Sequence, residues 1–490
     1  MNSQLSFTQH GMWIAARMGA GAAYHMPIVI SLDGAPDRGA LAKACAAVVE
    51  RHPLLGCALH DADGDPVLVP AAQAPALEEA GSVREVVTRP FDLTTGPLVR
   101  FALVGDETLV VVAHHLVFDG HSKDLLVADL AAYHRGAVPA EPAGETGHAE
   151  LVAAQRDRVA ALLPDAAAFW AGRWHEPADT AVPGGSLRSR RAADGEVREF
   201  PLDIPRLDAV TQFEVLVAAV HALLASYGNA EVVTALDLAT RTEREAGHIG
   251  PYVNELPLFS RPSGHTPFAA FAAAVRTELR EVYRHREVPL ARAVPGLRPH
   301  AALAPVSISY RRLPDTASTL GEVDWLAFNH SVRGALQLQV AHGPRGAVAS
   351  LRHDPLELPD AGRFAADLAG LLAAVAADPD RPLSDLLDFA PAPHPAQPAA
   401  APAAPAPLPA AAGDPPAPGD PLVARIRGIW EEVLEISPIG LDDDIFDLGG
   451  HSLTITQIIA RMQQQLGLEI GLDDFFDNST IAGVAAVVRR

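Results

Sequence analysis

Cysteine is nearly absent from this sequence, since its 490 residues contain only Cys45 and Cys57. Two cysteines cannot form a disulfide framework, and these two lack the partners of a zinc site, so we expect no metal. The sequence also lacks the run of roughly 18 apolar residues that a membrane-spanning helix needs. The nearest candidate, residues 215–225, is short and contains His221. The N-terminus has no basic region followed by an apolar stretch, which predicts no secretory signal and a cytoplasmic protein.

Positive charge is scarce as well. The chain has 38 Lys and Arg residues against 60 Asp and Glu residues, a formal net charge of −22, and its only lysines are Lys43 and Lys123. Nucleic-acid phosphate and anionic membrane surfaces would repel such a chain, so we expect neither as a partner. Hydrophobic residues make up 49% of the sequence, which is sufficient for sizeable cores, and the length predicts about three domains.

One segment differs sharply in composition from the rest. Residues 391–420 contain eleven prolines and twelve alanines, which is typical of an extended, semi-rigid tether. The segment separates a large part, residues 1–390, from a compact acidic part, residues 421–490. Two interpretations remain open: the tether lets the small domain move relative to the large part, or it is a passive spacer.

The large part alternates strand and helix patterns. The β-branched run at 108–113 predicts a strand covered on both faces, and alternation at 336–340 before a Gly-Pro-Arg-Gly turn predicts a half-exposed hairpin strand. The helical periodicities lie at 38–51, 149–174, 206–227, 266–285 and 360–377. This mixture predicts an α/β or α+β fold, and about 390 residues exceed the usual size of one core, so we expect two lobes.

Two adjacent histidines, His114 and His115, end the strand at 108–113 and precede Asp119-Gly120. Neighbouring strand residues point to opposite faces, so one histidine can face a cavity while the other packs into the core. A histidine with a near-neutral pKa is a candidate general base; the alternative is a hydrogen-bonded structural role. Asp119 either orients His115 or pairs with an arginine to hold the turn, and we favour the second. Ser122 is predicted to cap a helix at 123–133.

The acidic part contains an amphipathic helix at 422–434 and a second helix that ends near Leu466. Gly449-Gly450 permits a tight turn, and Ser452 stands at the start of the second helix. A phosphodiester on the serine oxygen would be stabilised by the free N–H groups and the dipole of that helix. The alternative is a simple helix cap.

The pattern His114-His115-x-x-x-Asp119-Gly120 resembles the HHxxxDG motif of the condensation domains of nonribosomal peptide synthetases, relatives of chloramphenicol acetyltransferase. Further segments resemble motifs of that family, in the expected order within residues 3–385: 6–13, 51–55, 89–93, 250–258 and 285–290. The string Leu-Gly-Gly-His-Ser-Leu around Ser452 resembles the peptidyl carrier signature.

The resemblance implies two chloramphenicol-acetyltransferase-like lobes in a V, at 1–180 and 181–390, an Ala/Pro-rich linker at 391–420 and a four-helix carrier bundle at 421–490. It implies an acyltransferase-type enzyme of secondary metabolism and antibiotic biosynthesis, in which an acceptor amine attacks a carrier-bound donor thioester and forms an amide. The alternatives are an ester-forming enzyme and a catalytically silent platform that recruits other enzymes while its carrier holds an intermediate.

By the same resemblance, His115 is the catalytic histidine and His114 the retained first histidine of the motif. The Gly120 N–H is a candidate oxyanion donor. Asp119 is expected to pair with Arg241, or in second place with Arg100, since a lone buried carboxylate is costly.

Two positions depart from the family's usual residues. His121 stands where Trp is frequent, and Glu255 stands where Thr is common. Both either tune the acceptor pocket or are neutral.

The resemblance also implies that Ser452 carries 4′-phosphopantetheine, with Leu453 on the docking surface of the carrier. A phosphopantetheinyl transferase and an upstream donor carrier protein are then expected partners. An adenylation domain does not fit within the linker. Two alternatives remain open: an adenylation enzyme loads a free-standing chain in trans, or the chain is an excised piece of a longer synthetase.

Overall fold

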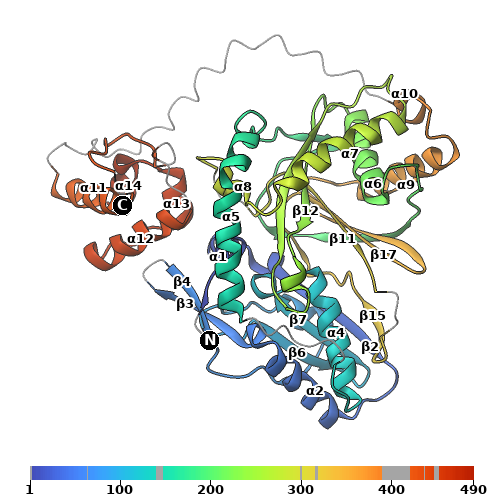
Figure 1. Cartoon of the computed structure of the whole chain (residues 1–490), viewed down its shortest axis with the longest axis horizontal. Helices are drawn as coiled ribbons and strands as arrows, with labels where there is room; N and C mark the ends of the chain where they lie inside the picture. The colour runs from blue at the N-terminus through green and yellow to red at the C-terminus, as the bar shows by residue number, and fades with distance from the viewer. Residues whose placement is uncertain are drawn as a thin grey trace.

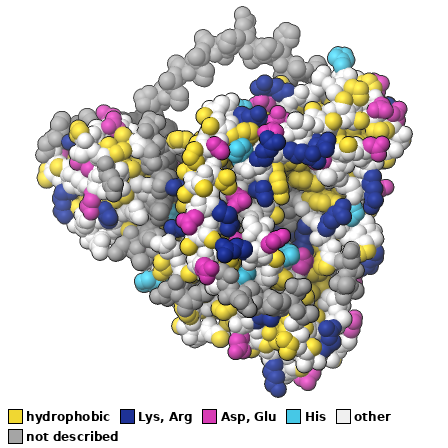
Figure 2. All heavy atoms as spheres, viewed as in Figure 1, with side chains coloured by type: hydrophobic (Ala, Val, Ile, Leu, Met, Phe, Trp, Pro, Cys, Tyr) yellow, Lys and Arg dark blue, Asp and Glu magenta, His cyan; other side chains and the backbone are white. Residues whose placement is uncertain are grey.

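The computed structural model describes residues 3–62, 65–139, 147–297, 301–314, 318–388, 420–434, 436–445, 448 and 452–489. Most of the predicted linker therefore lies outside the described residues. The large part is built on two sheets, one in each half of the chain (Figure 1). Both Lys and Arg side chains and Asp and Glu side chains occur over the face of the large part seen in Figure 2.

The first sheet has the strand order β15-β2-β7-β6-β5. Its strands are β2 (His25–Leu32), β5 (Leu77–Ala80), β6 (Val99–Val104), β7 (Thr108–His114) and β15 (Gly321–Asp324). Val110 and Val112 of β7 pack with a small cluster that includes residues of helix α3 (Val83–Thr88). Val111 belongs to the larger core on the opposite face. The prediction of a strand covered on both faces is confirmed.

The second sheet has the strand order β11-β18-β17-β14-β12-β13. Its strands are β11 (Glu196–Leu202), β12 (Val232–Ala239), β13 (Val253–Ser260), β14 (Val306–Arg312), β17 (Leu336–Gly343) and β18 (Gly346–His353). The predicted hairpin is present, with Gly343 paired to Gly346. The prediction that its first strand is half exposed is wrong: Gln337 is buried, and its amide oxygen accepts a hydrogen bond from the Arg333 N–H at 3.3 Å.

Strand β15 belongs to the second half of the chain but pairs antiparallel with β2 of the first sheet, from Gly321 opposite Leu32 to Asp324 opposite Val29. Gly321 has φ +137°, and a Cβ at this position would lie 2.0 Å from the Ser31 carbonyl oxygen, so no larger residue fits. Trp325 and Leu326 follow directly after this strand, and they line the same cavity as His115 of the first half of the chain.

The helices of the large part lie close to the predicted ranges. They are α1 (Phe7–Arg17), α2 (Arg38–Arg51), α3 (Val83–Thr88), α4 (Gly120–His134), α5 (His148–Ala171), α6 (Gln212–Ser226), α7 (Phe268–Arg284), α8 (Leu290–Ala293), α9 (Ala361–Ala377) and α10 (Leu383–Leu386). The helix predicted from residue 206 begins at Gln212, because Thr211 and Glu214 form a capping box there. No helix in the described part of the chain combines the length and apolar character needed to cross a bilayer.

Short elements complete the large part. They are β1 (Ser3–Gln4), β3 (Cys57–Ala62), β4 (Asp65–Pro70), β8 (Thr180–Val182), β9 (Gly185–Leu187), β10 (Ala193–Asp194) and β16 (Ser331–Val332), with 3-10 turns η1 (Gly21–Tyr24), η2 (Pro53–Gly56), η3 (His115–Val117) and η4 (Glu243–Glu245). Both cysteines are buried and free, so they pack rather than form a disulfide bond.

The acidic part forms four helices: α11 (Pro421–Leu434), α12 (Ser452–Leu466), α13 (Leu472–Asp477) and α14 (Ile481–Val487). The Trp430 ring stacks on the Phe475 ring, with centroids 5.6 Å apart, and both side chains are fully buried. The mixed α/β large part and the helical carrier region confirm the predicted fold class.

Candidate functional site

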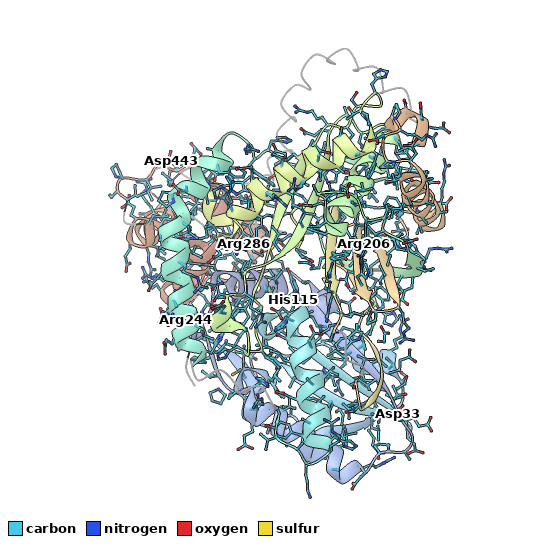
Figure 3. The ribbon with its side chains drawn as sticks, turned by 45° about the vertical axis from the view of Figure 1, so that its right-hand side comes forward. Asp33, His115, Arg206, Arg244, Arg286 and Asp443 are labelled. Carbon is cyan, nitrogen blue, oxygen red and sulfur yellow. The ribbon has the colours of Figure 1, made fainter. Side chains whose placement is uncertain are left out.

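The histidine motif lies where β7 ends, between the two sheets, and His115 is labelled at this position in Figure 3. His114 is the last residue of β7, whereas His115 has left the strand and begins the turn η3. The two side chains line different cavities, His115 one of about 370 Å³ and His114 one of about 310 Å³.

The His115 ring is oriented by the backbone. Its Nδ1 lies 2.7 Å from the Phe118 carbonyl oxygen, and a carbonyl only accepts, so Nδ1 carries the hydrogen in the neutral ring. Nε2 is then the proton acceptor. Burial, followed by the nearby Arg333 guanidinium, lowers the pKa of His115, which favours the neutral form at pH 7. This combination is what a general base requires.

His114 is held in the core. Its side chain is buried, its Nδ1 accepts from the Leu116 N–H at 3.1 Å, and its ring meets the Phe91 ring edge-on at 5.9 Å. Burial lowers the pKa of His114 to about 3, so the ring is neutral at pH 7. These contacts indicate a packing role.

Asp119 is the N-cap of α4 and accepts hydrogen bonds on both carboxylate oxygens. Oδ1 accepts from the Ser122 N–H and hydroxyl, each at 2.7 Å, and Oδ2 accepts from the Tyr252 N–H at 3.0 Å. The prediction that Ser122 caps this helix is wrong. Asp119 has the extended backbone of a cap, whereas Ser122 lies within the first turn and its hydroxyl bonds back to the carboxylate.

Arg241 lies beside Asp119, with Nη2 at 3.0 Å from Oδ1 and 2.9 Å from Oδ2. Their side chains are 10% and 7% exposed, and Arg241 also donates to the His248 carbonyl at 2.6 Å and to the Glu245 carbonyl. Arg241 follows β12 of the second sheet, so the pair ties the histidine motif to the other lobe.

Arg100, the second predicted partner of Asp119, is engaged elsewhere. It donates to the Arg89 carbonyl at 2.7 Å and the Pro90 carbonyl at 3.2 Å, and its guanidinium lies 3.7 Å from the centre of the Phe91 ring. Of the two arginines proposed from the sequence, the structure thus brings only Arg241 to Asp119.

Gly120 is the first residue of α4 and lines the His115 cavity. An N–H in the first turn of a helix has no intrahelical acceptor, so this donor is available to a developing oxyanion. The Gly120 carbonyl accepts from Arg311 Nη1 at 2.8 Å, and Arg311 in turn pairs with Asp124. These contacts hold the backbone at the start of α4.

Sequence reasoning missed several polar side chains of the cavity. Lys123 is buried, donates to the Pro27 carbonyl at 2.8 Å and the Trp325 carbonyl at 2.9 Å, and has its pKa lowered by burial to about 7. Asp237 interrupts the apolar strand β12 and lines the cavity with His115. A carboxylate within a buried strand is the local signal that could have identified Asp237.

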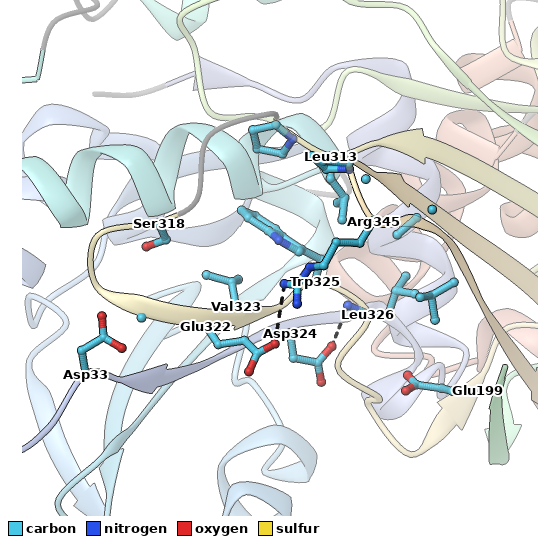
Figure 4. A pocket seen from close by; sticks show the side chains of 17 residues that line it. Asp33, Glu199, Leu313, Ser318, Glu322, Val323, Asp324, Trp325, Leu326 and Arg345 are labelled. Atoms are coloured by element: carbon cyan, nitrogen blue, oxygen red, sulfur yellow. Dashed lines mark hydrogen bonds and ion pairs between the residues drawn. The ribbon is translucent and has the colours of Figure 1, made fainter. Parts of the chain in front are cut away.

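A third, larger cavity borders the His115 cavity. It has a volume of about 880 Å³ and shares Trp325 and Leu326 with the His115 cavity. Figure 4 shows its acidic side chains along β15, where Glu322 pairs with Arg345 at 3.8 Å and Asp324 accepts from the Leu326 N–H.

His121 and Glu255, the two departures from the family pattern, occupy different places. The His121 ring is half exposed at the cavity, with Nε2 at 3.1 Å from the Ala246 carbonyl. Glu255 lies on β13, and its Oε2 accepts from the Leu303 N–H at 2.9 Å.

In the carrier region, α12 begins at Ser452. Gly449, Gly450 and His451, and the side chains of Ser452 and Leu453, lie outside the described residues. Within the part of the chain that the structure describes, no group of three or more His, Cys, Asp or Glu side chains is arranged to hold a metal ion.

Two protein families match the chain in separate regions. Residues 2–311 match the family described as "Condensation domain", and residues 424–488 match the "Phosphopantetheine attachment site". The chain belongs to the condensation-domain family, and a carrier domain that serves as a 4′-phosphopantetheine attachment site follows. The resemblance inferred from the histidine motif and the carrier signature is confirmed.

Curated relatives are large synthases. Chondramide synthase cmdD of Chondromyces crocatus is 26% identical over 430 residues, which are 78% of this chain and 11% of that protein. Tyrocidine synthase 3 of Brevibacillus parabrevis is 28% identical over 313 residues, which are 58% of this chain and 5% of that protein. The chain spans between 4% and 12% of the length of such relatives.

Solved structures share the fold. The condensation domain of the monacolin K polyketide synthase MokA gives a TM-score of 0.67 at 18% identity, covering 78% of this chain and 99% of that one. The first condensation domain of the calcium-dependent antibiotic synthetase, in complex with a substrate analogue, gives 0.66 at 20% identity, covering 79% and 98%. The teicoplanin X-domain in complex with OxyB gives 0.64 at 20% identity, covering 80% and 97%.

Proposed function

We propose that this chain is a condensation–carrier unit of a nonribosomal peptide synthetase that forms an amide from a carrier-bound donor thioester and an acceptor amine. The observation that carries the proposal is the His115 ring, whose Nδ1–H donates to the Phe118 carbonyl and leaves Nε2 as a base at the cavity. A general base positioned in this way contributes about 10²–10⁴-fold to a proton-transfer step.

The other motif residues support the same chemistry. The Gly120 N–H is proposed to stabilise the oxyanion that forms when the thioester carbonyl is attacked. Asp119 and Arg241 are positioning residues, because their pair holds the turn that carries His115 and Gly120. His114 packs the end of β7. We assign residues 1–180 and 181–390 to the two lobes, with β15 crossing back to the first.

Ser452 is proposed as the attachment residue of 4′-phosphopantetheine. It begins the 15-residue helix α12, and the free N–H groups of a first helical turn suit a phosphodiester. The group supplies a thiol that holds a substrate as a thioester. Because residues 391–420 leave no room for an adenylation domain, we propose that an adenylation enzyme loads this carrier in trans and that an upstream carrier protein delivers the donor.

Intact-protein mass spectrometry tests the proposed function. The chain is converted to its holo form, loaded with an aminoacyl group, and mixed with a donor carrier that bears an acyl thioester. The expected result is an increase in the mass of this chain, relative to its holo form, that equals the acyl group plus the aminoacyl group. A carrier that loads but never gains the acyl group would contradict the proposal.

A second candidate function is a silent platform. The X-domain of the teicoplanin system has this fold and is described in complex with OxyB, so in that protein the fold serves as a binding surface. Against this function here stand the intact His114, His115, Asp119 and Gly120 and the cavity at His115. An ester-forming enzyme would use the same residues with a hydroxyl acceptor.

A further inference from the structure

Two carboxylates lie side by side in the second sheet, and one of them lines the cavity that contains His115. Asp237 of β12 and Glu255 of β13 are direct partners in the antiparallel register, so their side chains leave the same face of the sheet. Asp237 lines the cavity of about 370 Å³. The Glu255 side chain is only 15% exposed. Like charges directly opposite each other in a sheet are destabilising, so this pair needs a compensating charge.

One arginine supplies that compensation for both carboxylates. Arg333 Nη2 lies 3.2 Å from Asp237 Oδ1 and 3.5 Å from Glu255 Oε1. Glu255 Oε1 is buried and has no hydrogen-bond partner within the described residues. Burial raises the pKa of Glu255, Arg333 lowers it, and Asp237 raises it further. The net effect is a raised pKa, and when both carboxylates are ionised they share the single positive charge of Arg333.

Three other cations that line the cavity have partners of their own, and one of them, Lys123, donates to the Pro27 and Trp325 carbonyls. Arg241 is paired with Asp119, and Arg311 is paired with Asp124. His115 is neutral at pH 7, because burial lowers its pKa. With Asp237 and Glu255 both ionised, one guanidinium against two carboxylates leaves a surplus of one negative charge beside His115. Buried surplus charge is costly unless a counter-ion occupies the site.

We propose, building on the proposed function, that this surplus charge binds the acceptor substrate as an ammonium ion. Asp237 contacts the ammonium group inside the cavity. Glu255 is a positioning residue, since it shares Arg333 with Asp237 and so leaves Asp237 incompletely neutralised. A hydroxyl acceptor brings no positive charge, so the site selects a primary amine and the product is an amide rather than an ester.

The reaction balances without a further reactant. The bound ammonium gives one proton to His115 Nε2, which releases it to solvent, and the free amine attacks the donor carbonyl. A C–N bond forms, and the C–S bond breaks as the tetrahedral intermediate collapses. The second proton of the nitrogen passes through His115 to the leaving thiolate, and the third remains in the amide.

Calorimetric titration of the whole chain without a donor tests the binding step alone. The probes are S-glycyl-pantetheine, which carries an ammonium group, and S-hydroxyacetyl-pantetheine, which carries a hydroxyl group in its place. The wild-type chain is expected to bind the glycyl probe at least about tenfold more tightly. Asp237→Asn is expected to remove this preference and Glu255→Gln to reduce it, while affinity for the hydroxyacetyl probe changes less than about twofold.

The matched control is Asp324→Asn, which removes one negative charge from exposed β15 outside the cluster and is expected to keep the preference. In turnover assays, Asp237→Asn is expected to raise the KM for the aminoacyl acceptor about tenfold with little change in kcat. Near-ultraviolet circular dichroism checks folding, and Glu255→Thr replaces Glu255→Gln where the latter does not fold.

Equal binding of the two probes by the wild-type chain would overturn the inference, as would a preference that survives both substitutions. The proposed function fails in a different way: the chain binds the glycyl probe selectively but forms no product with any loaded donor. The two failures are distinguishable because the titration involves no turnover.

Discussion

Replacing Asp119 by alanine removes the carboxylate that holds three segments at the histidine motif. Arg241 would lose both contacts near 3 Å, and the backbone N–H of Tyr252 and of Ser122 would lose their acceptor. The Arg241 side chain is 10% exposed, so water cannot readily replace the carboxylate. Breaking a buried pair by removing one partner costs about 3–5 kcal/mol, and we expect a loss of unfolding free energy in this range.

Urea denaturation of the whole chain, followed by near-ultraviolet circular dichroism, measures this loss. Asp119→Asn is the graded control, because it keeps an acceptor oxygen for Ser122 but not the charge, and it is expected to lose about 2 kcal/mol. Arg241→Met instead leaves the Asp119 carboxylate without its cationic partner. In the double variant both charges are absent, so its loss is expected to be smaller than the sum of the single losses by at least about 2 kcal/mol.

Two outcomes would refute this reasoning. Additive losses in the double-mutant cycle would mean that Asp119 and Arg241 do not act as a pair. A loss of activity in Asp119→Ala with unchanged stability would assign the carboxylate a direct catalytic role in place of the structural one.

Two further predictions concern the carrier and the buried histidines. Ser452→Ala is expected to gain no mass with coenzyme A and a phosphopantetheinyl transferase, while losing at most about 1 kcal/mol of capping; Ser437→Ala is the control that still gains the arm, and a gain by Ser452→Ala would disprove the assignment. Burial lowers the pKa of His25 to about 4 and of His114 to about 3. Below about pH 6.5 these two histidines therefore bind protons in the unfolded chain but stay neutral in the native chain. Stability is therefore expected to fall with pH from 6.5 towards 4 by up to about 1.4 kcal/mol per pH unit for each histidine, with a shallower slope in His114→Gln; a stability that does not change between pH 6.5 and 5 would contradict this.

Local patterns predicted much of the fold. The helix predicted at 38–51 is present with these bounds, and the Asp37 side chain caps it by accepting from the Ala40 N–H within one turn. The buried strand at 108–113 was recognisable because its continuous β-branched run fits only a strand covered on both faces. At α4 the sequence predicted Ser122 as the cap, whereas the backbone conformation shows that Asp119, three positions earlier, is the cap.

Contacts between segments that are distant in the sequence could not be predicted from such local patterns. The pairing of β15 with β2 joins residues almost 300 positions apart, and nothing in either segment alone specifies the other. The cluster of Asp237, Glu255 and Arg333 likewise depends on the register of β12 and β13. The sequence identifies Glu255 only as a departure from a family pattern. Its proposed role depends on its contacts with Asp237 and Arg333, which only the structure shows.

The central claim is that His115, and not His114, is the general base on which the rate of amide formation depends. Single-turnover amide formation with a loaded donor carrier measures this directly for His115→Ala and His114→Ala, alongside melting curves and carrier loading. His115→Ala is expected to remain folded, to load normally and to lose about 10²–10⁴-fold in rate, whereas His114→Ala is expected to act mainly through stability. Near-wild-type turnover by a folded His115→Ala chain would contradict the assignment of His115 as the base.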